Sequence, residues 1–558
     1  MQENSIPVTQ RGVELLRNPT LNKGSAFTLV EREQLGLSGL LPPAVTTLES
    51  QMLRVIENFR SEKSALDKYI YLRLLQDRNE TLFHAVLLRY MAEMTPIVYT
   101  PTVAEAVRHF SHIFRSSRGL YISPDNINHA DEILRSTPEG EVGIIVVTDN
   151  EGILGIGDQG VGGIAIPIGK LALYVAAGGF QPASCLPISL DVGTGNEQLL
   201  DDPLYIGLRK PRLKDDRYEE FIHQFVSAVK RQCPRAVLQW EDLSRARAFD
   251  TLIRYRDELP SFNDDIQGTA AVVQAALISA LHIAGRDLTD ETICIVGAGA
   301  AGVGVAAGLI AALQTRGISA QEARNRVFTF DSQGLIVADR ADLPEYKRQV
   351  AVEPELIREW DYTPQRTTLL EVIQHLRPGS LIGLSGHPGA FDQRTIEAMG
   401  TYQQRPIIFP LSNPSDNVEA HPHDVVRWTE GRAIIATGSP FEPLEYEGRL
   451  IHFSQVNNVY VFPGLGAGAY LSRARTITDA MLVAAARAVH GALDDGDVEA
   501  GRLLPHLARL RETAAQVAAA VMQAAITEGI AATDIPSASS RSVANWQYQP
   551  RYRPYVPA

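Results

Sequence analysis

Cysteine is scarce in this sequence. The 558 residues contain three, Cys185, Cys233 and Cys294, which lie far apart and form no Cys-x-x-Cys pair. A disulfide framework and a cysteine-ligated zinc site are therefore both unexpected. Isolated thiols are typical of a reducing compartment, so we expect a cytoplasmic protein.

Positive charge is also in deficit. Lys and Arg total 52 against 65 Asp and Glu, which gives a formal net charge of -13. Because such a chain repels phosphate backbones, nucleic acid is not an expected partner. A small anionic substrate would need a local cationic pocket. Residues 1–10 lack the basic stretch and apolar core of a secretory signal, which agrees with a cytoplasmic location.

An uninterrupted membrane-spanning segment is the third absence. Residues 292–314 carry no charge over a length that could cross a membrane, but Gly297, Gly299 and Gly302 would interrupt a single helix there. A buried strand, a tight turn and a buried helix explain this segment better. We therefore expect no membrane partner.

The remaining sequence has the length and the alternation of an α/β protein with two large domains. Apolar residues recur at helical spacing from about 46 to 114, and Pro96 and Pro101 predict an ordered loop within that region. An irregular tail from about Ile530 predicts a docking arm. Short apolar or β-branched runs between helical segments predict strands at 142–148, 186–191, 236–239, 326–330, 381–384, 407–410 and 433–437.

A glycine-rich turn carries the signature of a dinucleotide site. Gly297-x-Gly299-x-x-Gly302 follows a predicted strand and opens a predicted helix, which is the context that the fingerprint requires. The missing side chains let backbone N–H groups approach a pyrophosphate at the positive end of the helix. We therefore predict a Rossmann-like domain that binds NAD or NADP.

The choice between the two cofactors depends on Asp331. This residue ends the next predicted strand and can accept hydrogen bonds from the adenosine ribose hydroxyls, although Asp331-Ser-Gln-Gly also has the composition of a β-turn. Both interpretations can hold together. The acid favours NAD because it would repel the 2′-phosphate of NADP. Lys347 and Arg348 lie downstream and could neutralise that phosphate, so NADP stays open.

Two acidic pairs lie about one helix apart. Glu241-Asp242 ends a strand-like run, and Asp264-Asp265 lies in the segment Ser261-Phe-Asn-Asp-Asp-Ile-Gln-Gly-Thr. If the pairs converge at strand ends, they can supply three carboxylates to an octahedral Mg²⁺ or Mn²⁺, with water and substrate oxygens completing the shell. Taken as bare acid pairs, solvated turns would explain them better.

Other motifs make a metal site the better interpretation. Together they resemble the motifs of malic enzymes, and they occur in the same order along the chain. The similarity covers residues 12–526, and the resemblance implies oxidative decarboxylation of L-malate to pyruvate and CO₂ with reduction of NAD(P). The motifs are Ile97-Val-Tyr-Thr-Pro-Thr-Val, Ile166-Pro-Ile-Gly-Lys-Leu, Glu241-Asp242, Phe262-Asn-Asp-Asp-Ile-Gln-Gly-Thr, Leu411-Ser-Asn-Pro and Asn457-Asn458.

The resemblance also implies an architecture and a homodimer or homotetramer. We expect an N-terminal helical region (1–117), a parallel-sheet substrate domain (118–263 and 458–527), an inserted Rossmann-like domain (264–457) and a C-terminal tail (528–558).

Residue roles follow from the same resemblance. It implies that the metal is bound by Glu241, Asp242 and Asp265, that Lys170 is the base, Tyr99 the acid and Asp264 the partner of Lys170, and that Asn413 and Asn458 hold substrate beside the nicotinamide. The chemistry is reasonable, since a lysine beside a cation is pushed towards neutrality and can take a hydroxyl proton. In isolation, a surface lysine and a core tyrosine would be the better interpretation.

One position departs from most malic enzymes. They carry an arginine immediately before the motif Ile-Leu-Gly-x-Gly-Asp, where this chain has Gly152. That glycine, and to a lesser extent Trp240, resembles malolactic enzymes, which convert L-malate to L-lactate and CO₂ while retaining NAD. Gly268-Thr-Ala-Ala, Gly438-Ser-Pro-Phe and Asp158-Gln-Gly-Val-Gly are similar to malic enzymes and favour that activity.

The glycine has an expected cost. Loss of a substrate-binding arginine should weaken malate binding by about ten- to a hundredfold unless another cation compensates. Gly152→Arg is then expected to lower the Michaelis constant for malate. A further alternative, a nucleotide-sensing protein without catalysis, is disfavoured because Tyr99, Lys170 and the carboxylates are all present.

Two arginines suggest regulation. Arg54 and Arg78 match positions that bind a dicarboxylate effector at a subunit interface in some malic enzymes. Two guanidinium groups can hold a carboxylate in bidentate fashion. Surface salt bridges on helices explain them equally well.

Overall fold

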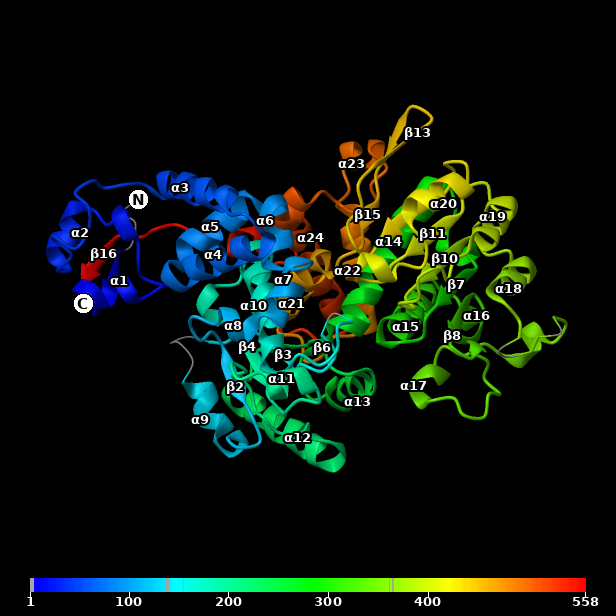
Figure 1. The fold of residues 1–558 in the computed structure, drawn as a ribbon, viewed down its shortest axis with the longest axis horizontal. Coiled ribbons are helices and arrows are strands. Elements are labelled where there is room, and N and C mark those ends of the chain that lie inside the picture. The colour runs from blue at the N-terminus through cyan, green and yellow to red at the C-terminus, as the bar shows by residue number, and fades with distance from the viewer. Residues whose placement is uncertain (1–4, 137–140, 154, 361, 364–365) are drawn as a thin grey trace. The chain divides into compact units, whose positions relative to one another are not determined.

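The computed structural model describes residues 5–136, 141–153, 155–360, 362–363 and 366–558 (Figure 1). The fold is α/β, as predicted. The chain divides into two compact units, which are Met1–Val146 with Asp158–Cys233 and Trp546–Ala558, and Val147–Gly157 with Pro234–Asn545. The four domains expected from the sequence are a different division and stay a prediction.

The first unit begins with helices. Thr47 and Ser64 close capping boxes at the starts of the helices that follow them, so the chain specifies these starts locally. The helices are α1 (Gly12–Arg17), α2 (Leu29–Gln34), α3 (Leu48–Ser61), α4 (Ala65–Arg78), α5 (Glu80–Arg89), α6 (Met91–Val98), α7 (Thr102–Arg108) and α8 (Phe110–Ile113). The predicted helical region is confirmed, but Pro96 lies inside α6 and not in a loop.

The rest of this unit surrounds a buried helix. Strand β2 (Leu120–Ile122) pairs in parallel with β4 (Cys185–Leu190). Every residue of α10 (Ala165–Leu173) is buried, and a π-helical turn, η4 (Tyr174–Gly178), follows it. The other helices are α9 (Ala130–Arg135), α11 (Glu197–Asp201) and α12 (Asp215–Gln232), and β3 (Ile144–Thr148) leads into the second unit.

Two described helices, Gly160–Gly178 and Asp264–Ala284, are long and apolar enough to cross a membrane by composition alone, but 100% and 78% of their apolar windows are buried. They are core helices.

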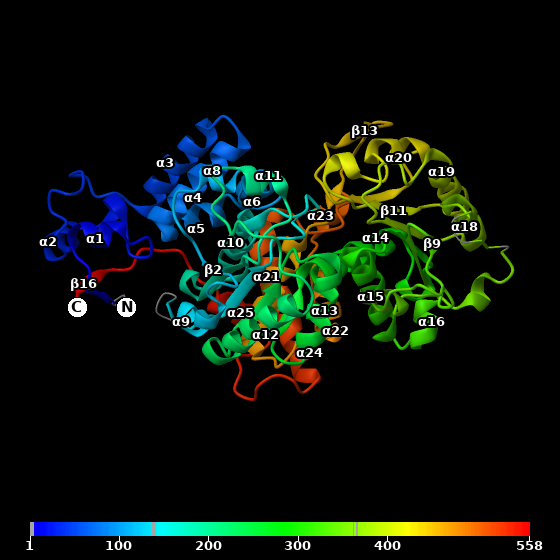
Figure 2. The ribbon, with the colours of Figure 1, turned by 60° about the horizontal axis from the view of Figure 1, so that its bottom comes forward.

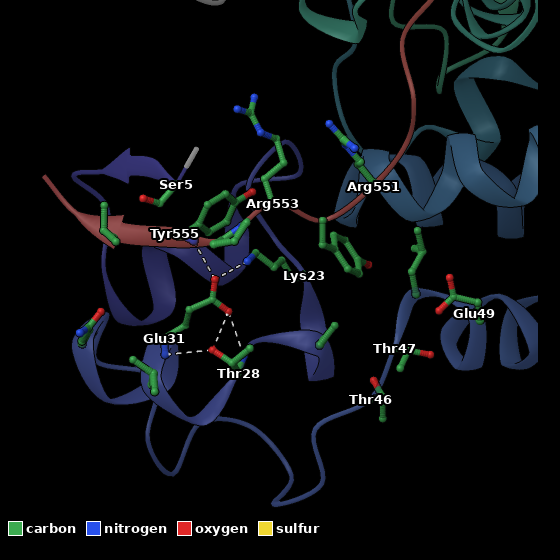
Figure 3. A pocket seen from close by; sticks show the side chains of 17 residues that line it. Ser5, Lys23, Thr28, Glu31, Thr46, Thr47, Glu49, Arg551, Arg553 and Tyr555 are labelled. Atoms are coloured by element: carbon green, nitrogen blue, oxygen red, sulfur yellow. Dashed lines mark hydrogen bonds and ion pairs between the residues drawn. The ribbon is translucent and has the colours of Figure 1, made fainter. Parts of the chain in front are cut away.

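The end of the C-terminal tail, Trp546–Ala558, belongs to the first unit, which agrees with the predicted docking arm. Strand β16 (Tyr555–Pro557) pairs in parallel with β1 (Ile6–Val8), and Figure 2 shows it beside α1 and α2. The backbone N–H of Tyr555 donates to Glu31 at 2.8 Å, and the same carboxylate forms a buried ion pair with Lys23 (Figure 3). The ammonium lies 3.9 Å from the centre of the Tyr555 ring.

The second unit contains a seven-stranded sheet in the order β15-β12-β11-β10-β7-β8-β9. Neighbouring strands in the described part of this sheet pair in parallel, except for the antiparallel edge pair β8 and β9. The strands are β7 (Ile293–Val296), β8 (Val327–Asp331), β9 (Gly334–Leu335), β10 (Ser380–Gly383), β11 (Ile407–Pro410), β12 (Ile434–Thr437) and β15 (Ser454–Gln455). The predicted strands are confirmed to within a residue or two at each end.

Helices cover both faces of this sheet, as in a Rossmann-like fold. Figure 1 shows α14 (Thr269–Ala284) and α15 (Ala300–Gln314) on one face, and α18 (Leu369–Leu376), α19 (Gln393–Tyr402) and α20 (Pro422–Trp428) on the other. The uncharged segment is therefore β7, a turn and α15, as predicted.

The second unit also contains strands outside this sheet and further helices. Strand β5 (Val237–Trp240) pairs in parallel with β6 (Ser261–Asn263), and β13 (Leu444–Tyr446) forms a hairpin with β14 (Arg449–Ile451). The other helices are α13 (Arg245–Tyr255), α16 (Ala320–Arg324), α17 (Glu345–Arg348), α21 (Phe462–Ser472), α22 (Asp479–Gly491), α23 (Asp495–Glu499), α24 (Leu510–Thr527) and α25 (Ser540–Trp546), whose last residue belongs to the first unit.

Candidate active site

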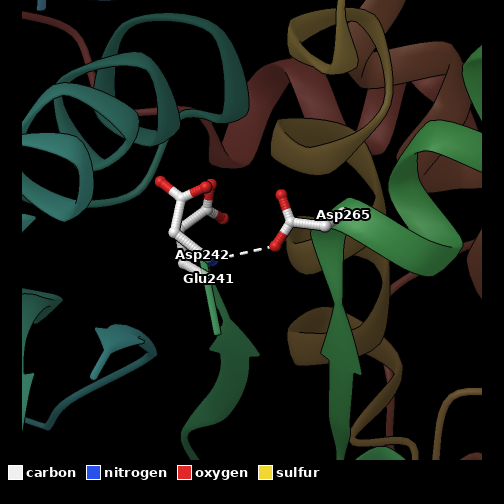
Figure 4. Close-up of side chains that lie close together, drawn as sticks. All are labelled: Glu241, Asp242 and Asp265. Atoms are coloured by element: carbon white, nitrogen blue, oxygen red, sulfur yellow. Dashed lines mark hydrogen bonds between the residues drawn. The ribbon is translucent and has the colours of Figure 1, made fainter. Parts of the chain in front are cut away.

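The predicted metal ligands come together in the second unit (Figure 4). Oxygen atoms of Glu241, Asp242 and Asp265 all lie within 4.8 Å of one another. Glu241 and Asp242 are buried, and Asp265 is half-buried. Three carboxylates at this separation repel one another unless a cation lies between them. An all-oxygen set of this kind fits Mg²⁺ or Mn²⁺.

Local structure explains how the two acidic pairs reach one place. Glu241 and Asp242 follow β5, and Asp242 has a left-handed backbone with φ of 52° that turns the chain sharply. Its backbone N–H donates to Asp265 Oδ2 at 2.8 Å. Asn263, at the end of β6, caps the π-helical turn η6 (Asp264–Gly268) by accepting from the N–H of Ile266 at 3.0 Å. The cap fixes the direction of Asp265.

Asp264 and Asn458, predicted for separate roles, share hydrogen bonds. The Asn458 amide donates to Asp264 Oδ2 at 3.0 Å and to the Asp264 carbonyl at 3.1 Å. A Cβ atom at Gly268 would lie 1.9 Å from Asp264 Oδ1, so only glycine leaves room for this carboxylate. The predicted pairing of Asp264 with Lys170 joins the two units and stays a prediction.

Lys170 and Tyr99 belong to the first unit. Lys170 is 1% exposed on α10, and its Nζ lies 5.6 Å from the centre of the Tyr99 ring. A Cβ atom at Gly169 would lie 2.5 Å from the carbonyl oxygen of Val98, so this glycine allows α10 to approach the residue before Tyr99. The structure thus places the predicted base and acid together, and it buries the lysine that a surface interpretation would expose.

The dinucleotide loop has the close contacts that its glycines predict. Gly297 has a φ of 112°, and a Cβ atom there would lie 2.3 Å from the carbonyl oxygen of Leu384. A Cβ atom at Gly302 would lie 1.7 Å from the carbonyl oxygen of Gly297. Helix α15 begins directly after Gly299, so its positive end faces the carboxyl edge of the sheet.

Asp331 forms ion pairs with two cations. Arg340 forms a bidentate ion pair with it, and Lys347 Nζ lies 2.6 Å from Oδ2. Burial alone would raise the pKa of Asp331, but these hydrogen bonds hold it at about 2. The sequence suggested Lys347 and missed Arg340. Arg348, also suggested, instead forms an ion pair with Glu345 at 3.3 Å.

The remaining predicted site residues are Asn413, Arg54 and Arg78. Asn413 follows β11 and accepts a hydrogen bond from the Ser439 hydroxyl at 2.6 Å. Arg54 and Arg78 are exposed on α3 and α4.

Gly152 has a structural reason that the sequence did not reveal. Its N–H donates to the carbonyl of Asp242 at 2.8 Å, and a Cβ atom would lie 2.5 Å from the carbonyl oxygen of Leu243. The loop therefore lies directly against the segment that carries two candidate metal ligands. This packing argues against the expected gain from Gly152→Arg, because any side chain must displace that backbone. Leu154, in the adjoining motif, lies outside the described residues.

A cation that sequence analysis missed also lies at this loop. Arg247, on α13, forms ion pairs with Asp149 at 4.0 Å and Glu151 at 3.8 Å. Both distances exceed those of hydrogen bonds.

Gly152→Ala tests the packing. The added methyl group must push Asp242 and Leu243 away, so we expect Mn²⁺ affinity to fall by about tenfold, which corresponds to about 1.4 kcal/mol of distortion. Titration calorimetry with Mn²⁺ measures the effect. Gly491→Ala, where a Cβ atom meets nothing within 4 Å, is the control. Equal metal affinity in both variants would refute the packing argument.

Comparison with known proteins identifies the family. Two family descriptions match the chain, "Malic enzyme, N-terminal domain" over residues 76–256 and "Malic enzyme, NAD binding domain" over residues 266–526. NAD-dependent malic enzyme from Pectobacterium carotovorum is 47% identical over 99% of this chain and 97% of its own length, and that from Proteus mirabilis is 45% identical over 98% and 96%.

Solved structures agree on the fold. Malic enzyme from Entamoeba histolytica has a TM-score of 0.55 at 23% identity and covers 92% of this chain and 90% of its own. That from Pyrococcus horikoshii has a TM-score of 0.53 at 25% identity and covers 81% and 87%. On the sequence and family matches, this chain belongs to the malic enzyme family.

Proposed function

We propose that this protein is an NAD-dependent malic enzyme, which oxidises and decarboxylates L-malate to pyruvate and CO₂. The observation that carries the proposal is the cluster of the carboxylates of Glu241, Asp242 and Asp265 in the same compact unit as the glycine loop. The NAD dependence of relatives that match nearly the whole chain supports the same activity.

The chain's own residues account for the proton transfers. Lys170 takes the proton of the C2 hydroxyl, because it is a buried amine on α10 whose Nζ lies beside the Tyr99 ring. Asn458, held by Asp264, orients the substrate oxygens. Tyr99 gives a proton to C3 after CO₂ leaves. A metal held by Glu241, Asp242 and Asp265 would supply Lewis-acid chemistry at the C2 oxygen, and NAD held at the glycine loop would supply the hydride acceptor.

One assay distinguishes this function from its alternatives. Purified protein is mixed with L-malate, Mn²⁺ and either cofactor, and reduced cofactor, pyruvate and lactate are measured together. Equal amounts of pyruvate and NADH support malic enzyme activity. Lactate in proportion to malate, without net NADH, would identify a malolactic enzyme. Cofactor binding without turnover would identify a sensor.

Cofactor choice gives a sharper test. We expect the enzyme to prefer NAD because Asp331 can accept hydrogen bonds from the ribose hydroxyls. Lys347 lies beside Asp331 and could also donate a hydrogen bond to the 2′-phosphate of NADP. We expect Lys347→Ala to raise the Michaelis constant for NADP by about tenfold, the effect of one charge-assisted hydrogen bond, and that for NAD by much less. Arg348→Ala is the matched control, because its side chain pairs with Glu345. A parallel rise for both cofactors in Lys347→Ala would contradict this role.

We also propose a homodimer formed by the N-terminal helices. Leu29 and Val30 on α2, Leu53 on α3 and Leu74 on α4 are between 47% and 68% exposed, which is high for large apolar side chains. Leu53→Glu is expected to shift the wild-type dimer to monomer in light scattering after gel filtration. Leu450→Glu, on the β14 hairpin and 60% exposed, is the control. A wild-type monomer would refute the proposal.

Two finer points belong to the same proposal. Arg54 lies next to Leu53 on α3, so a dicarboxylate held by Arg54 and Arg78 would act through that interface. If fumarate has no effect on malate kinetics at any concentration, this effector site is refuted.

The three cysteines are free thiols, which supports a cytoplasmic location.

A further inference from the structure

Two loops at the carboxyl edge of the seven-stranded sheet flank the dinucleotide site. Strand β10 lies between β11 and β7, and the strand order reverses beside β7. In sheets of this type the cofactor lies where the order reverses. The loops after β10 and β11, residues 384–387 and 411–413, therefore form one wall of the site.

A buried carboxylate joins these loops. Glu419 is fully buried and accepts hydrogen bonds from the Ser385 N–H at 2.7 Å and the Ser385 hydroxyl at 2.9 Å, both in the first loop. From the second loop it accepts the Ser412 hydroxyl at 2.5 Å and the Ser412 N–H at 3.3 Å. A Cβ atom at Gly383 would lie 2.5 Å from the Glu419 carboxyl carbon, so this glycine leaves room for the group.

The joined loops reach both ends of the site. Leu384, in the first loop, presents the carbonyl oxygen that excludes a side chain at Gly297. Ser412 precedes Asn413, the residue expected beside the nicotinamide, and its hydroxyl also accepts from the Gly386 N–H at 2.8 Å. A displacement of Glu419 would therefore move both Leu384, which contacts the glycine loop, and Asn413.

We propose that Glu419 is a positioning residue for the cofactor. It sets the separation of the two loops, and through them the position in which the dinucleotide binds. The inference rests on the proposed function only in the identity of the cofactor. A carboxylate suits the role because it offers acceptors alone, and all four groups that face it can donate.

The same sheet contains a matched control. Glu291 is also buried, and it accepts from the Ser380 hydroxyl at 2.6 Å. Ser380 is the first residue of β10, at the opposite edge of the sheet from Ser385. Glu291 and Ser380 thus repeat the buried carboxylate and serine of Glu419 and Ser412 away from the cofactor.

The experiment compares Glu419→Gln and Ser412→Ala with Glu291→Gln and Ser380→Ala. The dissociation constant of NADH is measured by fluorescence without malate or metal, and melting temperature is measured beside it. We expect NADH binding to weaken by about tenfold in the first pair, the effect of a charge-assisted hydrogen bond, and to be unchanged in the second. The melting temperature should fall comparably in both pairs.

Two outcomes would overturn the proposal: wild-type affinity for NADH in Ser412→Ala, or equal weakening in the control pair. Ser412→Ala removes one hydroxyl, so it keeps the test valid if Glu419→Gln does not fold. NADH binding needs no malate turnover, so a wild-type protein that binds NADH without oxidising malate would refute the proposed function and leave this inference under test.

Discussion

Asp265→Ala is expected to lose malate turnover by about a thousandfold or more, because a Lewis-acid metal contributes several kcal/mol and each 1.4 kcal/mol is about tenfold. Asp265 is the half-buried member of the cluster, so its replacement disturbs the core least. Its carboxylate also accepts from the Asp242 N–H, and the variant therefore loses a ligand and the orientation of a second one. Steady-state assays with Mn²⁺ measure the loss.

Metal binding separates this effect from misfolding. Free Mn²⁺, followed by electron paramagnetic resonance, should stay unbound in Asp265→Ala, while the NADH dissociation constant stays at the wild-type value. Asp290→Ala, an exposed acid in the same unit, is the control. Full wild-type turnover in excess chelator would rule out the metal assignment.

Lys170→Ala is expected to lower malate oxidation by about a hundred- to ten-thousandfold, the range of general base catalysis. The side chain is 1% exposed on α10, so the variant also leaves a cavity, and Lys170→Met is the better-packed comparison. Both should bind NADH normally, because the glycine loop belongs to the other compact unit. Stopped-flow measurement of NADH formation gives the rate.

Tyr99→Phe distinguishes the two proton transfers. Because the phenyl ring keeps the packing beside Lys170, we expect the variant to impair protonation at C3 more than oxidation at C2. Lys210→Ala, which removes an exposed ion pair with Asp125 in the same unit, should have wild-type rates. Wild-type turnover in the Lys170 variants would remove that residue from the mechanism.

The sequence predicted the architecture well because buried parallel strands are short apolar runs between helices, and β7, β8, β10, β11 and β12 all have this pattern. Pro96 shows where local signals fail. Proline usually ends a helix, yet α6 continues to Val98 around it. The packing of α6 in the first unit outweighs the lost backbone hydrogen bond.

The sequence predicted which residues belong to the site, but not which residues they contact. Motifs named Asp331, but its partner Arg340 lies nine residues away along a turn, and no periodicity connects them. Glu419 and Ser385 are 34 residues apart. Gly152 was interpreted as a missing arginine, whereas its position against Leu243 is a contact between backbones, which sequence patterns do not encode.

The pairing of β1 with β16 joins a strand that is synthesised early to one that is synthesised last among the described strands. Tyr555 donates to Glu31 across 524 residues, which a ribosome adds in roughly half a minute to two minutes at 5–20 residues per second. During that interval Glu31 has Lys23 but not Tyr555, and β1 is an edge without a partner. Unpaired edges invite wrong pairing. Strand β1 is thus synthesised long before the strand that completes it.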